Sequence, residues 1–87
     1  MVRIYVKLGE PLWRTTGQRR LELIWPAGVE VTAADVLARL AAEHPAFAAR
    51  YASAPYRLFV DATPVDAVAA PLADGQTLFI LLPAIGG

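Results

Sequence analysis

A single helix pattern lies between two pairs of strand patterns, and this order constrains the fold more strongly than any other feature of the sequence. After Thr32, apolar residues recur at the spacing of one helix face: Val36, Leu37, Leu40 and Ala41. One helix cannot cover both faces of a sheet. The order therefore predicts an α+β fold, in which a mixed sheet carries the main helix across one face and leaves the other face open.

The helix has a start signal and a stop signal. Asp35 follows Thr32 by three residues, close to the spacing of a capping box. Pro45 cannot continue a helix because its ring removes the backbone donor. These signals predict a helix over Thr32–Glu43, followed by a further irregular helical turn over residues 47–51.

The strand patterns flank this helix. Residues 2–8 alternate apolar and polar side chains, apart from Tyr5, and residues 20–25 begin in the same way, so the two are expected to pair as a hairpin. Further strands are predicted over 58–60, from Val65 and over 77–82, with turns over 61–64 and 71–75. The expected core contains Ile4, Val6, Val36, Leu37, Leu40, Leu78 and Ile80.

Composition excludes several classes of protein. Eight basic residues balance eight acidic ones, which argues against a nucleic-acid-binding surface, and 56% hydrophobic residues argue against disorder. The absence of cysteine excludes disulfides and thiolate metal sites. The longest stretch without charge, residues 75–87, is 13 residues long and too short to span a membrane as a helix. We therefore expect a cytoplasmic protein.

Residue types suited to catalysis are few. His44 is the only histidine and Ser53 the only serine, so a catalytic triad would need both, at positions typical of a helix end and a loop. Asp61 and Asp66 flank a turn, where aspartates usually cap the backbone. No ligand spacing indicates a metal site. An enzyme acting on its own is thus the least favoured of the three classes of function considered.

The end of the sequence carries the strongest functional signal. Gly86-Gly87 follow a strand pattern and Pro83, and glycine without a Cβ makes a thin segment that can enter a narrow channel. Residues 83–87 can reach about 17 Å, at ~3.4 Å per residue. The reacting group would be the α-carboxylate of Gly87, which is a poor acyl donor until it is activated, most simply by adenylation from ATP.

The same segment supports a family resemblance. A Leu72-Ala73-Asp74-Gly75 turn, an apolar strand, Pro83 and a terminal Gly86-Gly87 resemble the ending of the ubiquitin-like β-grasp sulfur carriers. These include the small subunit of molybdopterin synthase and the thiamine-pathway sulfur carrier. Residues 28–32 also resemble the family's approach to its helix. The resemblance implies a β-grasp domain over residues 1–82 and a flexible diglycine tail over residues 83–87.

The resemblance also implies partners and a mechanism. A ubiquitin-activating-enzyme-like adenylyltransferase would use ATP to adenylate Gly87, and a sulfur donor would convert the adenylate to a thiocarboxylate. The sulfur would pass to an acceptor, for example on the large subunit of molybdopterin synthase. The chain itself would bind no cofactor and no metal, and would serve as a co-substrate or subunit. The extended first loop and the extra turn near residues 47–54 favour the molybdopterin branch.

A partner-binding surface is expected beside the tail. If Leu78 and Ile80 face the helix, period-two alternation sends Phe79 and Leu81 to the open face. Phe59 is expected to join them, and Tyr5 to lie nearby. The predicted site residues are Gly86 and Gly87 for the chemistry, and Phe59, Phe79, Leu81, Pro83, Ala84 and Ile85 for partner binding.

Two alternatives stay open at this point. The tail chemistry is shared by carriers for thiamine, cysteine and tRNA thiolation, so the pathway is not fixed by the sequence. A non-catalytic β-grasp interaction module with an inert tail is the second class of function. Incubation with ATP and an activating enzyme separates the two, because only a carrier forms an AMP adduct at its C-terminus.

Overall fold

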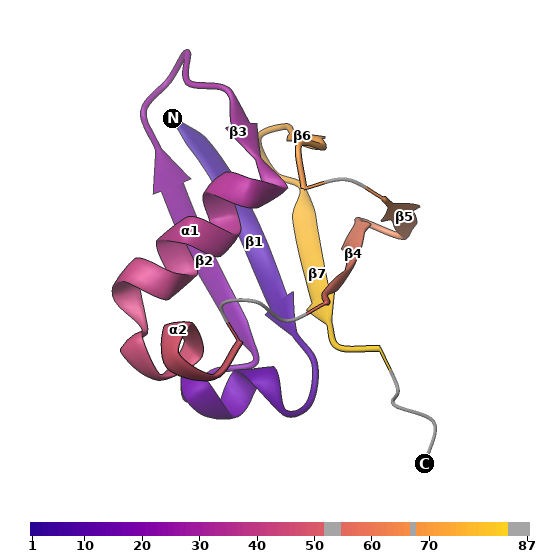
Figure 1. Ribbon diagram of the computed structural model, residues 1–87. Coiled ribbons are helices and arrows are strands. Elements are labelled where there is room, and N and C mark those ends of the chain that lie inside the picture. Colours follow the sequence, from indigo (N-terminus) through magenta and orange to yellow (C-terminus); the bar gives the residue numbers. More distant parts are fainter. Residues whose placement is uncertain (52–54, 67, 84–87) are drawn as a thin grey trace.

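Two parallel strands that are far apart in the sequence form the centre of the molecule (Figure 1). In the computed structural model, which describes residues 1–51, 55–66 and 68–83, a five-stranded sheet has the order β2-β1-β7-β4-β5 and a two-stranded sheet pairs β3 with β6. The strands are β1 (Val2–Leu8), β2 (Arg20–Trp25), β3 (Val31–Thr32), β4 (Arg57–Val60), β5 (Thr63–Val65), β6 (Pro71–Leu72) and β7 (Thr77–Leu81). The helices are the 3-10 helix η1 (Leu12–Thr15) and the α-helices α1 (Ala33–Glu43) and α2 (Pro45–Tyr51).

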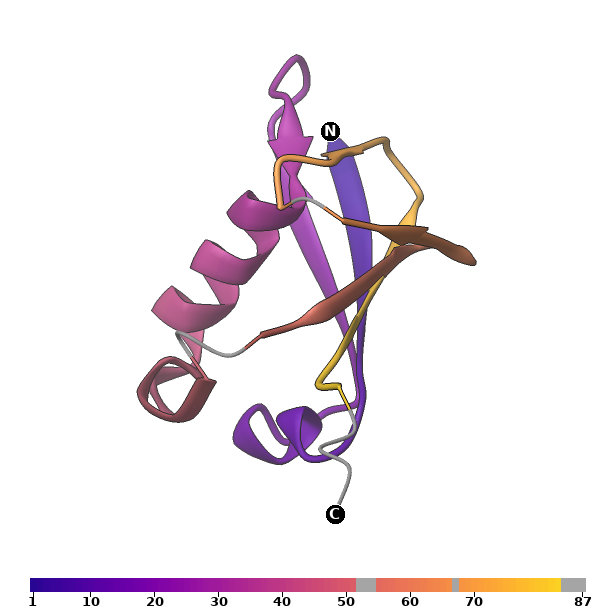
Figure 2. The same ribbon diagram turned by 45° about the vertical axis from the view of Figure 1, so that its right-hand side comes forward.

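The predicted sheet and helix arrangement is confirmed. β1 pairs antiparallel with β2, as the hairpin prediction requires, and parallel with β7, so the sheet is mixed. Figure 2 shows α1 and α2 on the same side of the large sheet, and no other α-helix of the described chain covers its opposite side. This leaves one sheet face open, beside the end of β7.

The core forms where the sheet meets α1. Because side chains alternate between the two faces of a sheet, every second side chain of β1 and β7 points at the helix. The apolar face of α1 packs against these side chains. The predicted core residues Ile4, Val6, Val36, Leu40, Leu78 and Ile80 are fully buried. Leu37 is only partly buried and packs against the edge of this cluster.

Both ends of α1 are fixed by the residues that the sequence indicated. The Thr32 hydroxyl accepts a hydrogen bond from the Asp35 backbone N–H at 3.3 Å, and the Asp35 carboxylate accepts one from the Thr32 N–H at 2.8 Å. This reciprocal capping box satisfies two N–H groups that the helix cannot bond internally. His44 is the C-cap, and Pro45 begins α2 instead of continuing α1.

The short elements differ from the sequence prediction. β5 covers Thr63–Val65, so it begins inside the turn predicted over 61–64 and ends at Val65, where a strand was expected to begin. Val31 pairs with Leu72, which lies in the turn predicted over 71–75, and this two-residue pairing buries both side chains in the core. The first loop contains η1, which buries Leu12. The irregular turn near Phe47 is a regular α-helix, because Phe47 is buried and stacks on Tyr56 with the ring centres 6.0 Å apart.

No helix among the described residues is both long enough and apolar enough to cross a membrane. The predicted boundary between a domain over residues 1–82 and a tail over residues 83–87 stays a prediction, because residues 84–87 lie outside the described part of the chain.

Candidate functional site

The open sheet face carries the apolar side chains that the alternation predicts. Phe79 and Leu81 alternate along β7 with the buried Leu78 and Ile80, so they point away from α1. Phe79 lies directly opposite Phe59 in the β4–β7 ladder. All three predicted contact residues on strands, Phe59, Phe79 and Leu81, are half-buried. They therefore form an apolar strip on the open face, while their role in partner binding stays a prediction.

Gly9 holds β1 against the end of β7. Its backbone N–H donates to the carbonyl oxygen of Ile80 at 3.0 Å, and a Cβ at this position would overlap Leu81 Cδ2. The atom in the way is the end of a flexible side chain, so a larger residue at position 9 would displace the Leu81 side chain and leave the backbone in place. The backbone hydrogen bond to Ile80 therefore holds β1 beside β7 three residues before Pro83, which is itself half-buried. The point at which the chain leaves the sheet is thus set by backbone hydrogen bonding.

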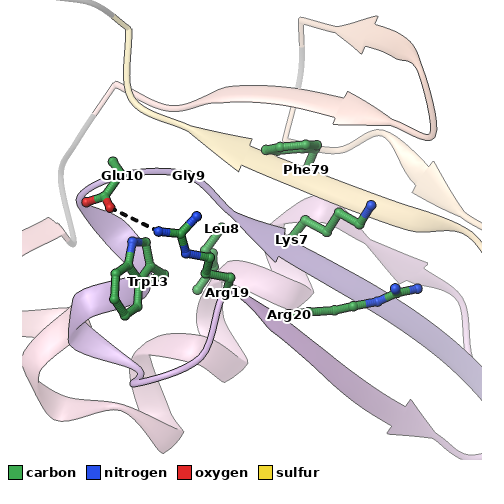
Figure 3. A pocket seen from close by; sticks show the side chains of 8 residues that line it. All are labelled: Lys7, Leu8, Gly9, Glu10, Trp13, Arg19, Arg20 and Phe79. Carbon is green, nitrogen blue, oxygen red and sulfur yellow. Dashed lines mark hydrogen bonds and ion pairs between the residues drawn. The ribbon is translucent and has the colours of Figure 1, made fainter.

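A cavity of about 340 Å³ opens beside Gly9 and is lined by β1, the loop after it, the start of β2 and Phe79 of β7. Figure 3 shows the side chains of Lys7, Arg19 and Arg20 around it, with Trp13 at one end and Phe79 at the other. We call it the tail-root pocket. It combines aromatic walls with three cationic side chains and the single carboxylate of Glu10.

The Glu10 carboxylate organises one end of the tail-root pocket. It forms ion pairs with Arg14 at 3.0 Å and Arg19 at 3.4 Å, and both guanidinium groups lie over the Trp13 ring, 5.0 and 4.8 Å from its centre. The indole Nε1 is buried and faces the carboxylate without reaching hydrogen-bond geometry (Figure 3). The Trp13 N–H, followed by Arg14 and Arg19, favours the ionised form and lowers the pKa of Glu10.

His44 and Asp61, which the sequence offered as candidates for catalysis, stabilise the ends of a helix and a strand. His44 ends α1, and its backbone N–H donates to the carbonyl oxygen of Leu40 at 2.8 Å. Asp61 has a positive φ of 55°, and its carboxylate accepts a hydrogen bond from the Thr77 N–H at 3.0 Å. Asp61 therefore fixes the start of β7. Ser53 lies outside the described residues.

Among the residues that the structure describes, no three His, Cys, Asp or Glu side chains gather closely enough to hold a metal ion. The remaining predicted site residues, Ala84, Ile85, Gly86 and Gly87, also lie outside the described part of the chain. The chemical role of the tail thus rests on its sequence.

Sequence reasoning missed the basic residues of the tail-root pocket. Lys7 shares the face of Phe79 by the alternation in β1 and the parallel register of β1 with β7. The alternation was visible in the sequence, but the register was not. Trp13, Arg14 and Arg19 come together through η1, which no sequence pattern indicated.

Comparison with known proteins identifies the architecture. No protein-family model matches the chain, and no curated protein matches its sequence. Among solved structures, small archaeal modifier protein 1 from Haloferax volcanii superimposes with a TM-score of 0.79 at 21% identity, covering 97% of this chain and 100% of that one. The fold is the ubiquitin-like β-grasp.

Other β-grasp structures agree over the same length. Small archaeal modifier protein 1 from Methanosarcina acetivorans gives a TM-score of 0.75 at 22% identity, covering 100% of this chain and 98% of that one. A chain from the complex of subunits 1 and 2 of molybdopterin-converting factor from Helicobacter pylori gives 0.66 at 16% identity, covering 99% and 100%. The resemblance to the β-grasp carriers that the sequence indicated is confirmed at the level of the fold.

Proposed function

We propose that the chain is a sulfur carrier whose Gly87 carboxylate is adenylated and then converted to a thiocarboxylate. The observation that carries the proposal is the combination of a whole-length β-grasp fold with a Gly86-Gly87 pair placed five and six residues after Leu81, the last residue of β7. We further propose that the sulfur serves molybdopterin synthesis in the cytoplasm, in line with the β-grasp chain of the Helicobacter pylori complex.

The proposed chemistry needs no general base, metal or bound cofactor from this chain. An oxygen of the Gly87 carboxylate bonds to the α-phosphorus of ATP, and the bond to pyrophosphate breaks. A sulfide-equivalent nucleophile from the sulfur donor then bonds to the acyl carbon, and AMP leaves. Transfer of the sulfur to an acceptor, with water supplying the replacing oxygen, restores the carboxylate. The partner adenylyltransferase binds ATP, and this chain supplies the acyl group and the surface that positions it.

A second candidate function follows from the names of two similar structures. They are called modifier proteins, which favours attachment of Gly87 to another protein. In that case an amine would displace AMP and form an amide bond. Carriers for thiamine, cysteine or tRNA thiolation share the adenylation step, and an interaction module with an inert tail would not undergo it.

Intact mass after incubation with ATP, the activating enzyme and sulfide tests the proposal. The native chain should gain the oxygen-to-sulfur mass difference on its C-terminal peptide, which also requires Gly87 to carry a free carboxylate. Deletion of Gly87 withdraws the carboxylate by ~3.4 Å, more than near-attack geometry tolerates, and should abolish the product. Gly86→Ala keeps the length and should slow the reaction less. Equal reaction rates for the native chain and the deletion variant would exclude the mechanism.

A further inference from the structure

The open sheet face divides into an apolar half and a basic half along one row of side chains. Lys7 lies opposite Arg20 in the β1–β2 ladder and beside Phe79 in the β1–β7 ladder, and Phe79 lies opposite Phe59. Four neighbouring strands therefore place two cations next to two aromatic rings. We call this set, Arg20, Lys7, Phe79 and Phe59, the basic-aromatic row.

The pairing of Lys7 with Arg20 lowers the local stability of the β1–β2 hairpin. Like charges directly opposite on one sheet face repel each other. The nearby acids do not relieve this repulsion. Glu22 pairs with Arg3 at 2.6 Å, and Glu10 pairs with Arg14 and Arg19. Within the described chain, neither Lys7 nor Arg20 forms an ion pair, and Arg20 lies over the Tyr5 ring, 5.4 Å from its centre.

The tail-root pocket gives this unpaired charge a shape that an anion can enter. Lys7, Arg20 and Phe79 all line the pocket, and Figure 3 shows the Lys7 and Arg20 side chains extending from the same side of the sheet. Both side chains are solvent-exposed. A carboxylate seated between them would remove the repulsion and gain two charge-assisted hydrogen bonds. Local features that oppose folding without a compensating contact are typical of functional surfaces.

The basic-aromatic row lies near the end of β7, so a partner bound to it would be close to the segment that follows Pro83. Phe79 precedes Pro83 by four residues, and Arg57 lies opposite Leu81, so a third cation borders the same end of β7. The chain as a whole is neutral, with eight basic and eight acidic residues. Positive charge is therefore gathered at this end of the sheet without any overall excess.

We propose that the basic-aromatic row binds an acidic patch of the partner adenylyltransferase, with a partner carboxylate between Lys7 and Arg20 and a partner apolar side chain over Phe79 and Phe59. This inference rests on the proposed function for the identity of the partner. The apolar half supplies contact area, and the basic half steers the encounter and fixes the register in which the tail enters the partner.

Charge-reversal variants with a matched control test the proposal. Lys7→Glu and Arg20→Glu should each weaken the Kd for the activating enzyme by roughly tenfold or more, the lower end of the range for steered association. Lys7→Arg keeps the charge and should bind like the native chain. Arg50→Glu makes the same charge change at an exposed position of α2, on the helix side, and should leave the Kd within a factor of two of the native value.

Salt dependence and product formation complete the test. Binding of the native chain should weaken as salt rises, and the Lys7→Glu variant should lose most of that dependence. At a carrier concentration below the native Kd, where binding limits the reaction, the rate of AMP-adduct formation should fall in each reversal variant together with the affinity, and it should stay at the native value in Arg50→Glu. Circular dichroism on each variant checks that the fold is retained.

The outcomes separate the two proposals. Adenylation with an unchanged Kd in both reversal variants overturns the acidic-patch inference and leaves the sulfur-carrier proposal standing. Binding that depends on Lys7 and Arg20 but is not followed by adenylation overturns the carrier proposal and supports the inference that the basic-aromatic row binds an acidic protein surface. Absence of both overturns both. If ATP or inorganic phosphate binds the isolated chain and Lys7→Glu abolishes that binding, the site takes a small anion, and the assignment to a protein partner is wrong.

Discussion

Replacing Lys7 by glutamate should make the protein more stable, although the residue lies on the surface proposed for partner binding. The β1–β2 register sets Lys7 opposite Arg20, and both side chains are exposed. Like charges at such a position destabilise a sheet, and opposite charges stabilise it by roughly 0.2–1 kcal/mol. Removing the repulsion and adding an attraction should together raise the free energy of unfolding by about 1 kcal/mol. For a chain of this size, that corresponds to a rise in Tm of about 4–8 °C.

Thermal unfolding followed by circular dichroism at low salt measures this effect. Lys7→Gln removes the repulsion without adding an attraction and should give about half of the rise. Lys7→Glu combined with Arg20→Glu restores like charges and should return Tm close to the native value. At 1 M salt, where the screening length is about 3 Å, the gain of the single variant should largely disappear. A Lys7→Glu variant that is no more stable than the native protein at low salt would refute the reasoning.

Three further predictions follow from the fold and the site. Thr32→Ala should lower the free energy of unfolding by about 1 kcal/mol through loss of the capping box, and Thr32→Ser should not; equal Tm values for the two would contradict this. Leu81→Arg faces Arg57 across the ladder, so it should keep the fold, lower Tm by a few degrees and weaken binding to the activating enzyme; unchanged binding excludes the apolar strip as a contact. The lowered pKa of Glu10 means that its ionised form stabilises the fold above the ordinary value of 4.5, and that this contribution is lost as pH falls through the folded pKa. Glu10→Gln should therefore flatten the acid side of the Tm profile below pH 5, and an unchanged profile would refute the assignment.

The parts of the fold that follow from side-chain periodicity were predictable. The stripe from Val36 to Leu40 and the alternation in residues 2–8 indicated the helix, its buried face and the first strand. Residues 77–81 are almost all apolar, so Phe79 could be assigned to the open face only on the condition that Leu78 and Ile80 face the helix, which the structure confirms. Signals of this kind are repeated over several turns or several alternations, so a single unusual residue such as Tyr5 does not hide them.

Short elements were not predictable for the same reason. β3 and β6 contain two residues each, too few to show alternation, and they pair because Val31 and Leu72, 41 positions apart in the sequence, are both buried in the core. η1 is stabilised by burial of Leu12, which is a tertiary effect. The tail-root pocket depends on η1 and on the strand register, so its charges could not be placed together from the sequence.

The central position of β7 has a consequence for when the protein becomes functional. Tyr5 pairs with Thr77, 72 positions later, and β7 is the last described strand to be synthesised. Pairing across such a separation delays folding until the late strand is available. Until then β1 lacks its parallel neighbour, β4 lacks the strand that joins it to the sheet, and the rings of Phe59 and Phe79 have no common surface. Nascent chains that stop before β7 therefore lack the apolar strip of Phe59, Phe79 and Leu81, which is the surface proposed to contact the activating enzyme.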